Sequence, residues 1–358
     1  MLVDISSPFG DRPGAARAID AAIAAAPHAT AERLPSSTDG NEDDLLLRVT
    51  GDGAARVLLL GHLDTVVPHA QHRPLHRTGD LLAGSGTIDM KGGDAIALAI
   101  LAEIARHAAW RARFAQLDLL LVCDEEWRHG PMHHAARFAG YDACLCFEAG
   151  ERDARGDEAV VVRRKAAGSV EVRATGQAAH AGAAPDEGRS ALLALSTVAL
   201  TLGALHDPHG DQQRSVVPSI LRSGEAVNIV PGDGTLTVDV RARDEAAFAD
   251  VIAAVPTELG GVRLDARLGR SWPGMDAAAD AAPILDVAAQ LLGRSIVPAA
   301  RGGASDASHL ARVVPLTIDG LGPLGAGSHA PHEHALASSF VPRSEVALAL
   351  LAATLGGA

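Results

Sequence analysis

Histidine and acidic residues end several apolar segments of the chain. His62 and Asp64 close "RVLLLGHLD", Glu125 and Glu126 close "LDLLLVCDEE", and Glu148 lies at the end of "DACLCFEAG". Continuous apolar segments are typical of buried strands in a parallel sheet, and such sheets build their sites where the strands end. Because carboxylates gathered at one edge repel each other, the pattern predicts a site for one or two divalent cations.

Two more residues complete the candidate metal site. Asp89 lies in the glycine-rich segment "GSGTIDMKGG", before a predicted helix, and His329 lies far downstream in "GAGSHAPHEH". Imidazole and carboxylate ligands without sulfur favour zinc, with cobalt and manganese as alternatives. Asp89 could bridge two ions about 3.5–4 Å apart, as in two-metal hydrolases.

The adjacent Glu125 and Glu126 indicate two different roles. Neighbouring side chains at a strand end point in different directions, so one can be a ligand while the other takes a proton from water that the metal activates. Asp64 is placed to hold the ring nitrogen of His62 that faces away from the metal. Each feature alone has a structural alternative: Asp89 could cap the following helix, and the acidic pair could be a solvated turn.

The elements that carry these residues alternate between strand and helix. The three apolar segments predict strands, and "GDAIALAILAEIARHAA" and "PMHHAARFA" predict the helices between them. This alternation predicts an α/β domain with a mostly parallel sheet, covered by helices on both faces.

A different pattern occupies residues 161–268. "GSVEVRATG" and "TLTVDVRAR" alternate apolar and polar residues, and "EGRSALLALSTVALTLGAL" and "EAAFADVIAAV" predict helices. Half-buried antiparallel strands with two helices on one face form an α+β sandwich. The α/β pattern then resumes, which predicts a catalytic domain from residues 1–160 and 269–358 with the sandwich inserted in it.

Composition narrows the classes of function. The chain has 358 residues, a net charge of −13 and no basic run, so neither a nucleic acid nor an anionic membrane is an expected partner. No apolar run approaches the roughly 20 residues of a membrane helix. The start, "MLVDISSPFGDRPG", carries no secretory pattern, and the cysteines do not suggest a disulfide framework, so we expect a cytoplasmic protein. Neither glycine-rich segment, "GSGTIDMKGG" nor "RGGASD", matches a Rossmann or P-loop pattern, which argues against a dinucleotide-dependent oxidoreductase.

Eight segments in order resemble one enzyme family. They are "GHLDTVVP", "GSGTIDMKGG", "VCDEE", "CFEAG", "GQAAHAGAAPDEGRSALL", "AVNIVP", "GGASDASHL" and "GSHAPHEH". They resemble the co-catalytic zinc metallopeptidases that include glutamate carboxypeptidase, succinyl-diaminopimelate desuccinylase, acetylornithine deacetylase and aminoacylase. The resemblance covers essentially the whole chain and is closest to the glutamate carboxypeptidase branch, chiefly through "ATGQAAHAGAAPDEGRSAL".

The resemblance implies two zinc ions per chain and a role for each ligand. His62 and Glu148 would hold one zinc, Glu126 and His329 the other, and Asp89 would bridge them. Glutamate as the fourth ligand argues against the family's aminopeptidases and dipeptidases, which more often use aspartate there.

The resemblance also implies that Glu125 is the general base and that the peptide bond from Asp89 to Met90 is cis. Relatives often read Asp-Glu-Glu-x-Gly where this chain has "DEEWRHG". The loop after the expected metal ligand Glu126 is therefore altered, and the sequence does not define the shape of the pocket near Trp127.

The inserted domain is expected, from the resemblance, to pair two subunits through its sheet edge and long helix. His180 in "ATGQAAHAG" would then reach the partner's site and bind the scissile carbonyl oxygen. Asn228 and Arg241 match positions that orient substrate carboxylates, with Ser305 near the same place. Alternatively, His180 is a surface histidine and Arg241 an exposed strand charge.

These features predict a zinc carboxypeptidase that cleaves the amide bond of a peptidyl or N-acyl amino acid with a free carboxylate. A deacylase of the acetylornithine or succinyl-diamine type is the first alternative. A non-catalytic dimeric binding protein is the second, and it would be favoured by a missing ligand or base. The sequence lacks none of them.

Overall fold

The computed structural model describes residues 1–356, which divide into two compact units. Unit 1 contains Met1–Arg163, Met275–Arg301 and the chain from Ser305 onward, and unit 2 contains Arg164–Gly274 with Gly302–Ala304. Unit 2 is thus an insertion in the sequence of unit 1. Each unit has its own sheet and its own core.

Among the described residues of unit 1, six strands form the central sheet, in the order β1-β2-β6-β3-β7-β19. They are β1 (Thr30–Leu34), β2 (Asp44–Thr50), β6 (Phe114–Val122), β3 (Ala55–His62), β7 (Ala143–Cys146) and β19 (Thr317–Ile318). Strands β6, β3, β7 and β19 run parallel, whereas β1 and β2 are antiparallel additions at one edge. The predicted mostly parallel sheet is therefore confirmed, with an antiparallel edge that the sequence reading did not foresee.

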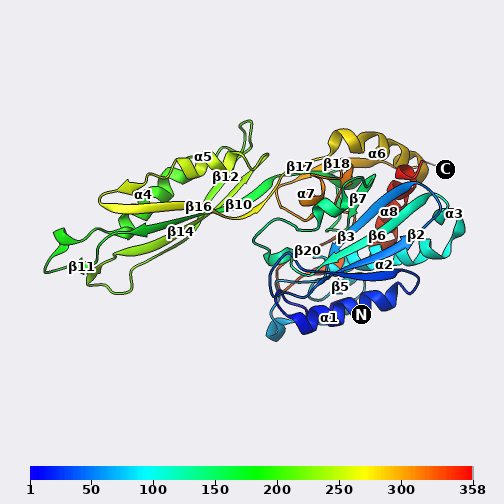
Figure 1. Cartoon of the computed structure of the whole chain (residues 1–358), viewed down its shortest axis with the longest axis horizontal. Coiled ribbons are helices and arrows are strands. Elements are labelled where there is room, and N and C mark those ends of the chain that lie inside the picture. The colour runs from blue at the N-terminus through cyan, green and yellow to red at the C-terminus, as the bar shows by residue number, and fades with distance from the viewer. Residues whose placement is uncertain (357–358) are drawn as a thin grey trace. The chain divides into compact units, whose positions relative to one another are not determined.

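Helices cover both faces of this sheet (Figure 1). They are α1 (Arg12–Ala25), α2 (Lys91–Arg106), α3 (Ala108–Arg111), α6 (Ala278–Leu292), α7 (Ala307–Leu310) and α8 (Phe340–Thr354). Alternate residues of β3 enter different clusters: Leu59 packs in the cluster that contains Ile100 of α2, and Leu58 in the cluster that contains Leu310 of α7. Burial on both faces explains why β3 reads as an uninterrupted apolar run.

Two small sheets in unit 1 hold the remaining strands. One has the order β20-β21-β5-β4, from β4 (His76–Thr78), β5 (Leu81–Ala83), β20 (Gly325–Ala326) and β21 (His334–Leu336). The other combines β8 (Glu151–Arg152), β9 (Glu158–Arg164), β17 (Met275–Asp276) and β18 (Ile296–Arg301). The first matters for the site because it joins chain segments about 250 residues apart.

Unit 2 is built on an antiparallel sheet with the order β12-β14-β10-β16-β15 in its described residues. The strands are β10 (Ala166–Thr175), β12 (Ser215–Ser223), β14 (Asp233–Ala242), β15 (Glu258–Leu259) and β16 (Val262–Trp272). The short strands β11 (Ala179–His180) and β13 (Ile229–Val230) pair separately. Helices α4 (Ala191–Gly203) and α5 (Ala247–Ala253) bury one face of the sheet, where Val172 and Val238 meet Leu195 and Phe248. This is the predicted α+β sandwich.

Two further expectations concern particular residues. The peptide bond from Asp89 to Met90 is cis, as the family resemblance implied. Cys123, Cys144 and Cys146 are buried and lie outside any disulfide, which agrees with the absence of a disulfide framework expected from the sequence. No helix within residues 1–356 has the length and apolar character needed to cross a membrane.

Candidate metal centre

The residues predicted as ligands lie where elements of unit 1 end. His62 is the last residue of β3, and Glu148 follows β7. Glu125 and Glu126 begin the short 3-10 helix η3 (Glu125–Trp127), just beyond β6. Because β3, β6 and β7 are parallel neighbours, their carboxyl ends meet at one edge of the sheet.

The other two predicted ligands come from turns beside the small sheet. Asp89 precedes α2, and His329 lies between β20 and β21. His329 has a left-handed backbone conformation, with φ of 64°, which is uncommon for a residue other than glycine. Such conformations persist where the surrounding structure holds them, often at functional sites.

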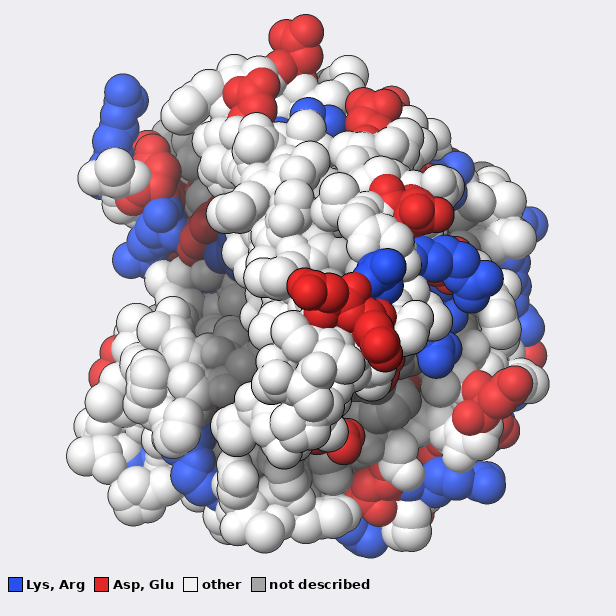
Figure 2. All heavy atoms as spheres, turned by 90° about the vertical axis from the view of Figure 1, so that its left-hand side faces the viewer, with Lys and Arg blue, Asp and Glu red and all other residues white. Residues whose placement is uncertain are grey.

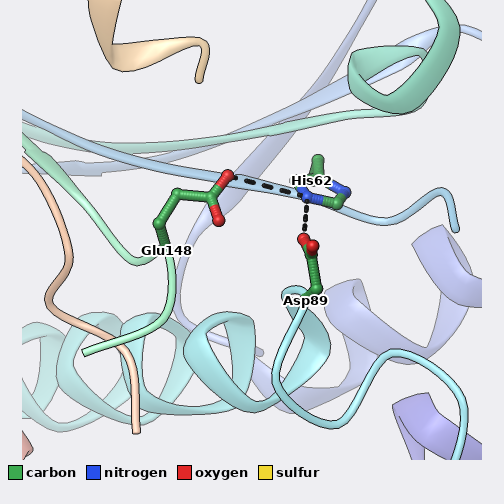
Figure 3. A group of neighbouring side chains, drawn as sticks. All are labelled: His62, Asp89 and Glu148. Atoms are coloured by element: carbon green, nitrogen blue, oxygen red, sulfur yellow. Dashed lines mark hydrogen bonds and ion pairs between the residues drawn. The ribbon is translucent and has the colours of Figure 1, made fainter. Parts of the chain in front are cut away.

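Asp89 and Glu148 both face the imidazole of His62 (Figure 3). His62 Nε2 lies 3.2 Å from Asp89 Oδ1 and 3.8 Å from Glu148 Oε1. The other ring nitrogen, Nδ1, lies 3.0 Å from the backbone carbonyl oxygen of Asp64. Since a carbonyl oxygen only accepts, Nδ1 must carry a proton, and in the neutral ring Nε2 is free to bind a metal.

The second group contains Asp89, Glu126 and His329. His329 Nε2 lies 3.1 Å from Asp89 Oδ2 and 3.1 Å from Glu126 Oε2. The two oxygens of Asp89 thus face different histidines, Oδ1 toward His62 and Oδ2 toward His329. In each group the candidate ligand atoms lie within 4.8 Å of one another, and Asp89 belongs to both. A carboxylate shared in this way is suited to bridging two cations.

The electrostatics of the site favour cations. Burial raises the pKa of Glu125 to about 7, with Glu148 adding to the effect and His62 opposing it. Burial likewise raises the pKa of Glu126 to about 7 against the hydrogen bond from His329. A nearby positive charge would favour the ionised form of both carboxyl groups and lower their pKa values.

In the metal-free protein, protonated histidine rings supply the positive charge near these carboxyl groups. Hydrogen bonds to Asp89 and Glu126 raise the pKa of His329 to about 11. Burial acts to raise the pKa of Asp89, but hydrogen bonds from His329 and His62 hold it well below its ordinary value. A divalent ion in each group would replace the protons on the two rings, and the imidazole and carboxylate donors fit zinc, cobalt or manganese.

Asp64 contacts both His62 and the adjacent acidic pair. Its carboxylate accepts the backbone N–H of Glu125 at Oδ1 (3.2 Å) and that of Glu126 at Oδ2 (3.0 Å). Its Oδ1 lies 3.4 Å from His62 Nδ1, which is farther than the backbone carbonyl of the same residue. The backbone carbonyl and the carboxylate of Asp64 therefore both face His62 Nδ1, and the carboxylate also fixes the start of η3 and with it Glu125 and Glu126.

The altered loop after Glu126 contains an ion-pair network that sequence reasoning missed. Arg128 is fully buried and pairs with Asp124 at 2.7 Å and with Asp306. Trp127 is 51% exposed and packs edge-on against His129, with ring centres 6.3 Å apart. The buried arginine thus ties the base of this loop to the segment before α7. Nothing in the local sequence distinguishes Arg128 from an exposed surface arginine.

Three of the predicted substrate-contacting residues lie in unit 2. His180 of β11 pairs with Ile229 of β13, and the backbone N–H of Ala181 donates to the carbonyl oxygen of Asn228 at 2.9 Å. His180 and Asn228 are therefore close neighbours, and both are exposed. Arg241, on β14, binds Asp239 (3.0 Å) and the carbonyl oxygen of Gly302 (3.2 Å).

The ring of His180 has a defined orientation. Its Nδ1 accepts the backbone N–H groups of Gly182 and Ala183, each at 3.1 Å. In the neutral ring the proton must therefore lie on Nε2, which becomes a hydrogen-bond donor.

Ser305 does not match its predicted role. It lies in unit 1, is fully buried, and donates its hydroxyl proton to Asp319 at 2.6 Å. The hydroxyl oxygen also accepts the backbone N–H of Ala307 at 3.2 Å. The side chain is committed within the protein, which leaves no hydroxyl proton for a substrate.

The chain has recognisable relatives. Residues 58–353 match the family described as Peptidase family M20/M25/M40. The chain is 28% identical over 333 residues to carboxypeptidase G2 of Pseudomonas sp. (strain RS-16), covering 88% of this chain and 77% of that protein. It is also 28% identical over 323 residues to a succinyl-diaminopimelate desuccinylase of Alkalilimnicola ehrlichii, covering 83% of each.

Solved structures share the fold. Aminopeptidase PepT from Bacillus cereus matches with a TM-score of 0.77 at 18% identity, covering 99% of this chain and 96% of that one. The metallo-carboxypeptidase Sso-CP2 from Sulfolobus solfataricus matches with a TM-score of 0.76 at 12% identity, covering 99% and 97%. At these identities the likeness establishes the architecture alone.

Proposed function

The chain belongs to Peptidase family M20/M25/M40, and we propose that within it the protein is a two-zinc carboxypeptidase for substrates with a free carboxylate. It is a metal-dependent hydrolase of peptidyl or N-acyl amino acids. The observation that carries the finer proposal is the pair of ligand groups that share Asp89. Glu125 lies beside these groups but is a member of neither, as far as the described residues show.

The proposed ligands divide as the two groups do. His62 and Glu148 would hold one ion, Glu126 and His329 would hold the other, and Asp89 would bind both. When bound, zinc ions polarise a substrate carbonyl and lower the pKa of water to about 7. Cobalt or manganese would satisfy the same donors.

Glu125 is proposed as the general base. The N–H of its backbone is fixed by Asp64, which holds the start of η3 against the end of β3. Burial raises the pKa of Glu125 in the metal-free protein, and neighbouring cations would lower it, so the carboxylate would be ionised near neutral pH, able to take a proton from the attacking water and pass it to the leaving nitrogen. The water oxygen would form a bond to the carbonyl carbon, and the C–N bond would break as Glu125 passes the proton to the nitrogen, which gives an amine and a carboxylic acid and returns Glu125 to its ionised form.

His180 is proposed to bind the scissile carbonyl oxygen. Two backbone amides occupy its Nδ1, so Nε2–H is the donor available to a substrate. A donor of this kind typically stabilises the transition state by about 2.7–4 kcal/mol. Asn228, its neighbour across β11 and β13, and Arg241 are proposed to orient the free carboxylate.

Unit 2 is proposed to pair two copies of the chain. Helix α4 exposes Leu193 (69%) and Leu200 (78%), and strand β12, at the edge of the sheet, exposes Val217 and Ile220. Figure 2, in which unit 2 faces the viewer, has large areas without acidic or basic side chains. An apolar helix face beside an open strand edge favours association. In such a homodimer His180 would serve the partner's metal centre.

The first alternative is an N-acyl-amino-acid deacylase, which the similarity to the desuccinylase supports. Both functions use the same chemistry and differ in which side of the amide bond the protein recognises. A non-catalytic dimeric binding protein is the remaining alternative, and the complete set of ligands with Glu125 argues against it.

The test is a panel of dipeptides and N-acyl amino acids assayed with zinc, cobalt and manganese after chelation. Each substrate is paired with its C-terminal amide, which lacks the free carboxylate. A carboxypeptidase should hydrolyse the free acids and largely reject the amides. Equal rates on both members of each pair would refute the free-carboxylate requirement, and full activity without metal would refute the metal centre.

A further inference from the structure

Glu333 connects two turns of the candidate metal centre. It lies four residues after His329, and only 2% of it is exposed. Its Oε2 accepts the backbone N–H of Gly86 at 2.8 Å, and its Oε1 accepts those of Ile88 at 3.0 Å and Asp89 at 3.2 Å. The Glu333 side chain thus accepts hydrogen bonds from three backbone amides of the turn that ends in Asp89.

The small sheet frames this contact. Strands β5 and β21 are antiparallel, with Ala83 opposite His334. The turn that contains Asp89 follows the end of β5, and the turn that contains His329 precedes the start of β21. Because the two strands are antiparallel, both turns lie at the same end of this strand pair. Glu333, next to His334, closes the space between them, although 244 residues separate it from Asp89 in the sequence.

The turn before α2 needs such support. Gly86 has φ of 80°, a conformation that glycine adopts easily and leaves easily. The two oxygens of Asp89 must also point to different histidines, one at 3.2 Å and one at 3.1 Å. A rotation of the Asp89 backbone would turn at least one oxygen away, and the hydrogen bonds to Ile88 and Asp89 oppose that rotation.

We propose that Glu333 is a positioning residue of the metal centre, which holds the bridging Asp89 in register with His329. This inference rests on the proposed two-metal function and assigns Glu333 no contact with a metal or substrate. Groups that orient metal ligands from outside typically account for about 10- to 100-fold in metal affinity. Because Asp89 is shared, the loss of Glu333 should weaken both ions.

Two substitutions separate geometry from charge. In Glu333→Gln, one oxygen can still accept, but the NH₂ group would face a backbone N–H donor. Glu333→Asp keeps the negative charge but is one methylene shorter, so it falls short of the amides. If positioning is the role, both variants should bind metal more weakly than the wild type.

The matched control is Glu158→Gln. Glu158 is also buried in unit 1, with 4% exposed, and accepts hydrogen bonds from Arg343 and Arg152, each at 2.9 Å. It belongs to neither ligand group of the described residues. Its substitution should lower the stability of the fold and leave metal affinity unchanged.

The experiment is a cobalt titration of the chelator-treated full chain, followed by the visible absorption of bound Co²⁺. Thermal unfolding of each metal-free variant reports stability separately. We expect Glu333→Gln to bind cobalt about 10- to 100-fold more weakly, Glu333→Asp to be weakened as well, and Glu158→Gln to match the wild type.

Three results would overturn the inference: wild-type affinity in Glu333→Gln, wild-type affinity in Glu333→Asp, or an equal loss in Glu158→Gln. If Glu333→Gln fails to fold, the comparison of Glu333→Asp with the control decides the matter. A wild-type protein that binds no cobalt would instead refute the proposed function, so the two failures are distinguishable.

Discussion

Asp94→Asn should stabilise the metal-free protein, and increasingly so as the pH rises. Asp94 lies in the first turn of α2 and is fully buried. Neither of its carboxylate oxygens has a hydrogen-bond partner among the described residues. Burial raises its pKa to about 8, although His62 and Lys91 act to lower it.

The sign and size follow from the proton that Asp94 keeps. The unfolded chain releases this proton near the ordinary pKa of 3.8, whereas the folded protein keeps it up to about pH 8. The contribution of protonated Asp94 to the free energy of unfolding is therefore fully present below pH 3.8 and is lost as the pH rises through about 8. At about 1.4 kcal/mol for each pH unit, the loss at pH 7 is roughly 4 kcal/mol. Asparagine cannot ionise and escapes it.

The assay is denaturant unfolding of chelator-treated wild type and Asp94→Asn between pH 4 and pH 8. The two proteins should have similar stability near pH 4, where both side chains are neutral, and diverge toward pH 7. Asp286→Asn is the control, because Asp286 is an exposed acid on α6. A difference between wild type and Asp94→Asn that stays constant with pH would refute the reasoning, as would an equal trend in the control.

Three further outcomes are expected. Glu125→Gln should retain metal and lose about 10²–10⁴-fold in activity, whereas Glu126→Gln should lose metal in elemental analysis; exchanged phenotypes would reverse the two roles. His180→Ala should retain metal and lose about 10²–10³-fold in kcat. Mixing it with Glu125→Gln chains should restore activity, and no recovery after verified subunit exchange would contradict action across a dimer. Arg128→Met should lower the free energy of unfolding by about 3–5 kcal/mol, because it leaves the buried carboxylate of Asp124 without its oppositely charged partner; a loss below about 1 kcal/mol would contradict this.

The central fold could be predicted because its signals are local. Strands such as β3 and β6 are buried on both faces, so each is a short apolar run that differs plainly from the alternating strands β10 and β14. The positions of His62 and Glu126 at the ends of these runs also predicted that both residues lie at the same edge of the sheet, as candidate metal ligands. Periodicity and strand ends are properties of neighbouring residues, which a sequence displays directly.

Glu333 could not be predicted for the opposite reason. Its partners are backbone amides from 244 to 247 residues away, and an amide carries no side-chain identity for a sequence pattern to reveal. The contacts of the Asp64 carboxylate with the backbone amides of Glu125 and Glu126 were missed in the same way. Ser305 shows the converse error: a hydroxyl in a glycine-rich segment suggested a substrate contact, but tertiary packing gave it a buried partner.

The division of residues between the units suggests how metal binding and substrate handling can be separated. The five candidate ligands and Glu125 belong to unit 1, as do Asp64 and Glu333, which orient them. His180, Asn228 and Arg241 belong to unit 2. Substitutions in unit 2 should therefore change kcat or KM at constant metal content, whereas substitutions of ligands or of Glu333 should change metal content first. A unit 2 variant that lost metal would mean that the two units share the site more closely than the proposed division of roles allows.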